Sequence, residues 1–327
     1  MQEIISDISF VIIALNEEFA IKKCLDSIAK IPLLNCEIIC VDSDSADNTL
    51  AIMKDYKPKF ECFRIFVLKG YANPAIARNI GLRHASKKYI FFVDGDVELS
   101  GEFIKKAVVK LGNGWDAVTG RLEEYQYSKG YKRLLNKITD RMAIKKEAAV
   151  YLTGGVFIAK REAIKKTGKF DERFGNSEDI EFTLRLSRLY KIIAIEESMG
   201  IHHTIPYSNL IRIKEGLAKF YGVYYGMVFR KNLFFRNGMY ELIMRGYGTI
   251  LGVFTVFFFV ILFFYLNREI AFFLVFLILL LDILYMNTKK KGVIATIYAH
   301  YIYPFYFLFG IFFNINFTKE YSVFEVT

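Results

Sequence analysis

Two aspartates separated by one glycine, Asp94-Gly95-Asp96, directly follow the apolar run of residues 89–93. Such a run is typical of a central strand, and an open α/β sheet binds its ligands at the carboxyl ends of its strands. Carboxylates two residues apart can direct oxygens at one hard cation, and the glycine lets a phosphate approach the backbone. The motif therefore indicates a Mg²⁺ or Mn²⁺ site for a nucleotide diphosphate, and a simple acidic turn is the alternative interpretation.

Alternating strands and helices must position this turn. Hydrophobic periodicity predicts four strands, at residues 9–14, 36–41, 63–67 and 89–94, separated by helices at residues 17–31, 47–56 and 76–85. Right-handed crossovers between such strands give a mainly parallel sheet. Asn16, Asp42 and Asp94 then lie at one edge of the sheet, where the first, second and fourth strands end.

The next part of the chain has a less regular pattern. It predicts a helix at residues 101–111, a strand at 117–123, a long helix at about 131–150, a strand at 156–159, a helix from 178 to about 190 and a strand at 192–195. The acidic pair Glu178-Asp179 opens the fifth of these elements. It either supplies a catalytic carboxylate or simply occupies the favourable first turn of a helix capped by Ser177.

Five segments, in this order, resemble the family 2 glycosyltransferases, which are inverting enzymes of the GT-A fold. These segments are residues 10–17, 41–49, 77–81, 94–96 and 178–179. The resemblance covers about residues 7–215. It implies an α/β, Rossmann-like domain with a mainly parallel sheet, which binds a nucleotide-diphosphate sugar donor and a divalent ion, Mn²⁺ or Mg²⁺.

The resemblance also implies roles for single residues. Contacts to the nucleotide sugar are expected from Ala14, Asn16, Glu17, Asp42, Asp44, Arg78, Asp94 and Gly95. Asp96 is the expected direct metal ligand, Asp94 binds the metal through water or contacts the ribose, and His203 is either a third ligand or an ordinary histidine. Asp179 is the expected catalytic base, and Glu178 orients the reacting groups or contacts the acceptor.

Two sequence features bear on the donor nucleotide and on the type of sugar transfer. The segment Asp42-Ser43-Asp44 departs from the two adjacent aspartates and the glycine that are common in the family, which leaves the base of the nucleotide open. No tryptophan follows Asp179, so the Gln-x-x-Arg-Trp motif of processive polysaccharide synthases is missing. Transfer of one sugar per encounter is therefore favoured over polymerisation.

The carboxyl-terminal part of the sequence is strongly apolar. Residues 248–266, 270–286 and 293–317 each have about the length of a membrane span, about 17 to 25 residues. The chain has a formal net charge of +10, and seven basic side chains face only two acidic ones between residues 200 and 245. These patterns predict an integral membrane protein that contacts membrane lipids, with its catalytic domain on the cytoplasmic face. Nucleic-acid binding is the disfavoured explanation of the basic charge.

The expected organisation is a GT-A domain at residues 1–215, a basic aromatic segment at 216–245 and two or three transmembrane helices at 246–327. The expected activity is metal-dependent, inverting transfer of one sugar to the hydroxyl of a lipid-linked or glycan acceptor. One alternative is a polyprenyl-phosphate monosaccharide synthase, whose acceptor is a phosphate. The other is a catalytically inactive GT-A module that serves as a membrane scaffold.

Overall fold

The computed structural model describes residues 5–206, 210–245, 302–313 and 320–326, with the single positions 273, 277 and 280. The chain forms two compact units, one of residues 1–205 with 317–327 and the other of residues 206–316. All residues for which the sequence predicts a chemical role belong to the first unit, which is called the larger unit below.

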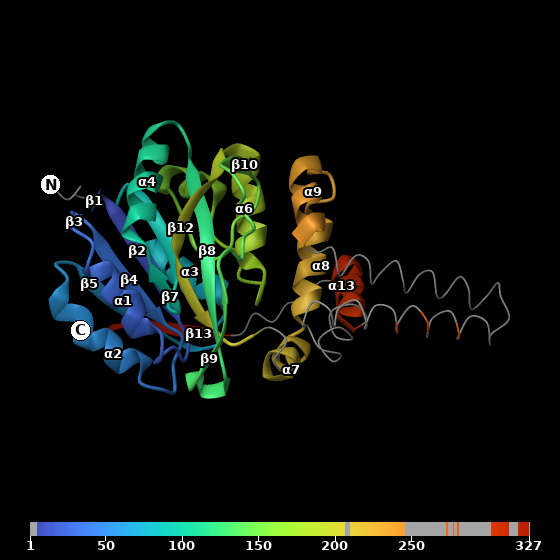
Figure 1. Cartoon of the computed structure of the whole chain (residues 1–327), viewed down its shortest axis with the longest axis horizontal. Helices are drawn as coiled ribbons and strands as arrows, with labels where there is room; N and C mark the ends of the chain where they lie inside the picture. Colours follow the sequence, from blue (N-terminus) through green and yellow to red (C-terminus); the bar gives the residue numbers. More distant parts are fainter. Residues whose placement is uncertain are drawn as a thin grey trace. The chain divides into compact units, whose positions relative to one another are not determined.

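Four parallel strands form one half of the main sheet. In spatial order they are β5 (Phe63–Gly70), β4 (Glu37–Asp42), β2 (Ile8–Ala14) and β6 (Tyr89–Asp94). The helices between them are α1 (Ile21–Ala29), α2 (Thr49–Tyr56) and α3 (Pro74–His84). The predicted alternation of strands and helices is confirmed. β2 and β4 lie side by side (Figure 1), and because β6 pairs parallel with β2, all three strands end at the same edge of the sheet.

The other half of the sheet is mixed. Its strands are β11 (Phe157–Lys160), β8 (Ala117–Tyr127), β12 (Ile192–Thr204) and β10 (Ala148–Val150), with β7 (Val97–Leu99) on β12 and β9 (Leu134–Ile138) on β8. β11 runs antiparallel to both β6 and β8, whereas β8 and β12 are parallel. β8 and β12 therefore point the same way as β6, and they end at the edge that carries Asp94.

Three further helices pack in the larger unit, α4 (Gly101–Gly112), α5 (Arg161–Thr167) and α6 (Glu178–Leu189). A small separate pairing joins β1 (Ile5–Ser6) to β3 (Leu33–Leu34). The long helix predicted at residues 131–150 is wrong, because this stretch contains β9 and β10 instead. Leu134 and Leu135 are 40% and 46% exposed, so pairing with β8 determines the conformation here, and apolar periodicity does not detect such pairing.

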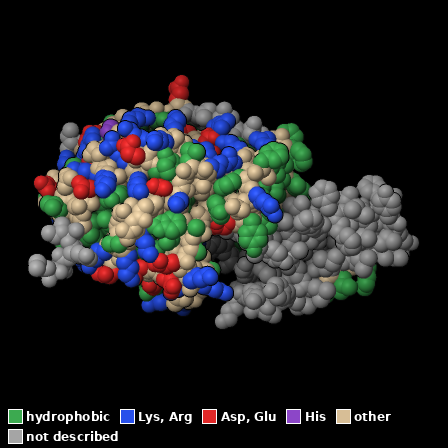
Figure 2. Space-filling model, turned by 90° about the horizontal axis from the view of Figure 1, so that it is seen from above, with side chains coloured by type: hydrophobic (Ala, Val, Ile, Leu, Met, Phe, Trp, Pro, Cys, Tyr) green, Lys and Arg blue, Asp and Glu red, His purple; other side chains and the backbone are tan. Residues whose placement is uncertain are grey.

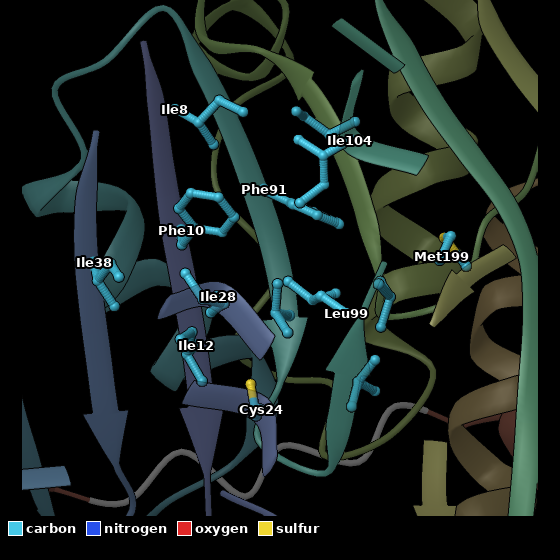
Figure 3. Packing of buried hydrophobic residues seen from close by; sticks show 14 of the residues in the cluster. Ile8, Phe10, Ile12, Cys24, Ile28, Ile38, Phe91, Leu99, Ile104 and Met199 are labelled. Carbon is cyan, nitrogen blue, oxygen red and sulfur yellow. The ribbon is translucent and has the colours of Figure 1, made fainter. Parts of the chain in front are cut away.

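Two apolar layers cover the faces of the sheet. Ile8, Phe10 and Ile12 of β2 point into one layer, where they meet Ile28 of α1 (Figure 3). The intervening Val11 belongs to the other layer. This alternation buries β2 on both faces, as expected for a central strand, so the free carboxyl ends of the strands are left to carry the polar residues.

A strand from the end of the chain completes one side of the sheet. β13 (Tyr321–Val326) pairs antiparallel with β5. Glu325 of β13 accepts two hydrogen bonds from the guanidinium of Arg64 of β5, at 2.7 and 2.9 Å. Residues 206–316 are therefore inserted between two strands of one sheet, β12 and β13.

The second unit contains helices α7 (Leu210–Ala218), α8 (Tyr221–Lys231), α9 (Arg236–Arg245) and α13 (Tyr303–Phe312). Within this unit α8 and α13 pack so closely that a Cβ on Gly226 would clash with the carbonyl oxygen of Phe307. Ten residues give α13 a length of about 15 Å, half of the roughly 30 Å of a bilayer core.

Across the described part of the chain, no helix has both the length and the apolar character needed to cross a membrane. This finding corrects the prediction of an integral membrane protein with its catalytic domain on the cytoplasmic face. The predicted span at residues 248–266 lies outside the described residues, as do that at 270–286 apart from positions 273, 277 and 280, and that at 293–317 apart from residues 302–313.

Candidate active site

The Asp94-Gly95-Asp96 turn is held against the end of β2. The backbone N–H of Gly95 donates to the carbonyl of Ile13 at 2.8 Å. A Cβ on Gly95 would lie 2.9 Å from the Cβ of Ala14, so a larger residue at either position would push the turn outward. Gly95 and Ala14, which the sequence assigned to nucleotide binding, thus lie together and fix where the two carboxylates point.

Arg78 links the first aspartate of this turn to α6. Its guanidinium, which is 3% exposed, donates from Nη2 to Oδ1 of Asp94 at 2.6 Å and from Nη1 to Oε1 of Glu178. Arg78 lies on α3, whose start is fixed by Asn73, because the Asn73 side chain accepts a hydrogen bond from the N–H of Ile76. Two carboxylates from distant segments are therefore joined by one buried cation.

Burial strongly affects the acids in this bridge. Burial raises the pKa of Glu178 to about 7, even though Arg78 acts in the opposite direction. Burial also raises the pKa of Asp94, again against the effect of Arg78. Gly155 closes this cluster from one side, since a Cβ there would lie 2.5 Å from Nη2 of Arg78 and 2.6 Å from Oδ2 of Asp94.

Asp179 lies in the first turn of α6, next to Glu178. It is less buried than Glu178, and its Oδ1 accepts a hydrogen bond from the N–H of Ile180 at 2.8 Å. Ser177 occupies the N-cap position, but its hydroxyl bonds to Asn176 and makes no capping bond to the helix. The helix start thus leaves Asp179 next to the Arg78 bridge.

Asp96, the second aspartate of the turn, contacts a histidine. Nε2 of His202 lies 2.9 Å from Oδ2 of Asp96, and Nδ1 of the same ring lies 3.4 Å from Oε2 of Glu124. Glu124 is 1% exposed, and Arg141 approaches its Oε2 to 3.4 Å. Burial tends to raise the pKa of Glu124, but hydrogen bonds from His202 and Gln126 outweigh it, so this pKa lies below its usual value.

His203, the histidine that the sequence singled out, has other neighbours. Its Nε2 lies 3.3 Å from Glu98 Oε2, its Nδ1 lies 3.0 Å from the hydroxyl of Tyr127, and burial lowers its pKa. Sequence reasoning selected His203 rather than its neighbour His202 and overlooked Glu124. Glu124 follows the strand predicted at residues 117–123, so the rule that selected Asp94 could also have found it.

The donors at this edge fit a divalent cation in part. Among the described residues, no group of three or more His, Cys, Asp or Glu side chains forms a ready metal site. Mg²⁺, however, commonly takes only one or two carboxylates and completes its shell with water and substrate phosphates. Asp94 and Asp96 supply such carboxylates, with the imidazole of His202 beside them, so they suit a cation that arrives with a diphosphate.

A second group of predicted residues lies where β2 and β4 end. Asn16 Oδ1 accepts from the N–H of Ala46 at 2.8 Å, which ties the two loops together. Asp42 is 1% exposed and accepts from the N–H of Ser45 at 3.0 Å, and burial raises its pKa. The other oxygen of Asp42, Oδ1, is buried and has no hydrogen-bond partner in the described structure.

Two other residues predicted to contact the nucleotide help to shape these loops. Asp44 has a φ of +61° and Asn16 one of +56°, a left-handed conformation that short polar side chains tolerate better than most others. The backbone N–H of Glu17 donates to Oγ1 of Thr49 at 2.8 Å. The structure therefore brings Asn16, Glu17, Asp42 and Asp44 together near the Asp94-Gly95-Asp96 turn, which is called the DGD turn below.

An α/β mixed sheet with this acidic edge defines a GT-A-like domain of the glycosyltransferase class. Residues 9–168 match the family described as Glycosyl transferase family 2, and the prediction that the protein is a glycosyltransferase is confirmed.

Curated relatives agree with this assignment. Over 215 residues the chain is 24% identical to glycosyltransferase AglE of Haloferax volcanii. This match covers 63% of this chain and 69% of AglE. It is 39% identical over 100 residues to the poly(ribitol-phosphate) beta-glucosyltransferase of Bacillus spizizenii, and this match covers 29% of this chain and 16% of that protein. It is 25% identical over 210 residues to the GalNAc(5)-diNAcBac-PP-undecaprenol beta-1,3-glucosyltransferase of Campylobacter jejuni, and this match covers 63% of this chain and 65% of that protein.

Solved structures support the fold. The structure of residues 1–349 of Staphylococcus aureus TarS in complex with UDP-GlcNAc matches with a TM-score of 0.50 and 21% identity. The match covers 60% of this chain and 58% of that one. The GT-A-like architecture is therefore shared, although the sequences have diverged widely.

Proposed function

We propose that this protein transfers one sugar, with inversion, from a nucleotide-diphosphate donor to a hydroxyl of a glycan or lipid-linked acceptor, in a metal-dependent reaction. The observation that carries the proposal is the bridge through Arg78, which holds Asp94 of the DGD turn and Glu178 of α6 on one cation. It brings the expected leaving-group side and the expected base side of the reaction to one edge of the sheet.

Asp42 supports nucleotide binding at this edge. Its buried Oδ1 lacks a hydrogen-bond partner among the described residues, and a buried acceptor left unpaired is costly. An N–H group of a nucleotide base would satisfy it. The linked loops that carry Asn16 and Asp44 would then contact the base or the ribose.

The DGD turn is the proposed site for the diphosphate. Asp96 and Asp94 would hold Mn²⁺ or Mg²⁺, and His202 would either join them or orient Asp96. A divalent ion bound there would neutralise the negative charge that develops on the departing diphosphate. Gly95 leaves room for a phosphate next to the backbone.

Asp179 is the proposed base. It takes the proton of the acceptor hydroxyl while the new bond forms from that oxygen to the anomeric carbon and the bond from this carbon to the diphosphate oxygen breaks. Proton transfer of this kind contributes on the order of 100- to 10,000-fold in rate. Glu178, buried and bonded to Arg78, positions the helix start that presents Asp179.

The test is turnover of radiolabelled UDP- and GDP-sugars with Mn²⁺ and a panel of glycan and lipid-linked acceptors. Asp179→Asn should lower transfer to hydroxyl acceptors by about 100-fold or more while donor binding, measured by calorimetry, persists. Glu162→Gln, an exposed change on α5, is the control and should retain full activity. A wild-type chain that turns over no donor, or an Asp96→Ala variant as active as wild type, would refute the proposal.

The Asp179→Asn variant also distinguishes transfer to a hydroxyl acceptor from the polyprenyl-phosphate alternative. A phosphate acceptor is already ionised and needs no base, so Asp179→Asn would leave its glycosylation intact. Unchanged transfer by Asp179→Asn, together with a product that carries a sugar phosphate, would support that alternative instead.

A further inference from the structure

A hollow of about 580 Å³ opens in the larger unit, away from the residues described above. The side chains that matter for its chemistry are three aromatic ones and three polar ones: Trp115, Tyr151, Tyr190, Asn113, Ser187 and Lys191. Its volume is within the range of about 300 to 1,000 Å³ that is usual for small-molecule sites. Neither the catalytic scheme nor the family match gives this hollow a role.

The sheet places this hollow at the opposite edge from the DGD turn. Trp115 precedes the start of β8, and Lys191 precedes the start of β12. Glu124 and His202, which lie beside Asp96, are near the other ends of the same two strands. The seven-residue step from Ala117 to Glu124 corresponds to about 23 Å of strand. The hollow is therefore a separate site.

Two segments nevertheless connect the hollow with the catalytic edge. Helix α6 begins with Glu178 and Asp179, and its last turns carry Ser187. The eight residues from Asp179 to Ser187 correspond to about 12 Å of helix. The chain that lines the hollow at residues 149–151 also reaches Gly155, beside Asp94, after four more residues. Helix α6 and the segment of residues 149–155 therefore each contribute to both sites.

The lining suits a sugar ring. Tryptophan and tyrosine offer large, rigid apolar faces together with a polar group, which match the C–H face and the hydroxyl groups of a pyranose. Asn113, Ser187 and Lys191 add hydrogen-bonding groups at the rim. Lys191 is the one charged side chain of the lining, so the site lacks the cluster of cations that a nucleotide or a phosphorylated ligand would require.

The platform for such a ring is fixed in place. Trp115 packs against the apolar layer that contains Phe10, and Tyr190 packs against the layer that contains Val11. Figure 2 views the structure from above and shows one face of the molecule, where hydrophobic side chains lie among Lys, Arg, Asp and Glu side chains.

We propose that the hollow lined by Trp115, Tyr151 and Tyr190 is a second sugar site, which binds pyranose rings of the acceptor glycan remote from the hydroxyl that reacts. The link to an acceptor rests on the proposed function, whereas the binding of an oligosaccharide does not. The two ideas can therefore fail separately.

The sequence provides a specific probe, because Trp115 is the single tryptophan of the chain. Its intrinsic fluorescence in the full-length protein should change saturably on titration with chitotetraose or maltotetraose. Asn113→Ala and Lys191→Ala change exposed side chains and should each weaken the response at least several-fold. Leu189→Ala, next to the hollow but 63% exposed and outside its lining, is the matched control. No saturable change with either tetrasaccharide, or equal binding by all variants, would overturn the proposal.

A second measurement tests the link to the acceptor. Lys191→Ala and Tyr190→Ala should raise the KM for a tetrasaccharide acceptor while leaving kcat, and the KM for a monosaccharide acceptor, unchanged. Equal effects on both acceptors would refute this role. Asp96→Ala should lose transfer but keep the fluorescence response, so a failure of catalysis would remain distinct from a failure of the second sugar site.

Discussion

Nε2 of His202 lies 2.9 Å from Oδ2 of Asp96, and the neighbouring His203 turns to Glu98 and Tyr127 instead. Adjacent residues of a strand point to opposite faces, so a histidine pair on β12 cannot serve one site with both rings. The register of β12 with β7, which pairs His202 with Val97, determines which ring meets the turn.

This contact leads to a first prediction. His202→Ala should weaken the binding of Mn²⁺, so the metal concentration that gives half-maximal turnover should rise by about 10- to 100-fold. His203→Ala is the matched control and should have a much smaller effect. Turnover measured across a Mn²⁺ titration distinguishes the two, and a larger effect of His203→Ala would restore the ligand set expected from the sequence.

Arg78 leads to a second prediction. Arg78→Ala leaves the buried Glu178 and the partly exposed Asp94 without their shared cation, so the free energy of unfolding should fall by about 3 kcal/mol. Arg83→Ala removes an exposed arginine of the same helix and should change it by less than about 0.5 kcal/mol. Urea unfolding monitored by circular dichroism gives both values. Similar values for the two variants would mean that the bridge contributes little to stability.

The high pKa of Glu178 predicts how stability depends on pH. An acid whose pKa is about 7 in the folded chain and about 4.5 in the unfolded chain favours folding while it is protonated. Its stabilising contribution is complete below about pH 4.5 and disappears as the pH rises through 7. Between these values, the free energy of unfolding of wild type should fall relative to that of Glu178→Gln, which cannot titrate. Parallel pH profiles of the two proteins, from urea unfolding at pH 5, 6, 7 and 8, would contradict this assignment.

Two neighbouring glycines give a sharp test of the packing around the bridge. A Cβ on Gly155 would lie 2.5 Å from Arg78 and 2.6 Å from Asp94, whereas a Cβ on Gly154 would meet nothing within 4 Å. Gly155→Ala should therefore displace the bridge and lower turnover at least tenfold, and Gly154→Ala should retain it. Turnover of the two variants under identical conditions provides the comparison. Equal activity would show that the bridge can shift without loss.

Much of the site could be predicted because its residues lie at strand ends. Asp42 and Asp94 follow apolar strands that periodicity detects, and the parallel order of these strands places both residues at one edge. The link from Arg78 to Glu178 could not be derived in this way, because it joins segments 100 residues apart. Only the packing of α3 near α6 brings the two side chains into contact.

The rest of the fold depends on pairing between distant strands. β9 and β10 form where the sequence predicts a helix, and β13 joins the sheet from the far end of the chain. Strand pairing depends on partners elsewhere in the chain, so a local pattern of apolar residues contains little information about it. The sequence could not distinguish His202 from His203 for the same reason, since the register of β12 decides which histidine meets Asp96.

β12 and β13 belong to one sheet. A break in the backbone between them would therefore leave the fragment that carries β13 paired with the fragment that carries β5. Six residues of β13 pair with β5 in an antiparallel ladder, and two charge-assisted hydrogen bonds join Arg64 to Glu325. A chain nicked once within residues 206–316 would then remain a noncovalent complex of two fragments.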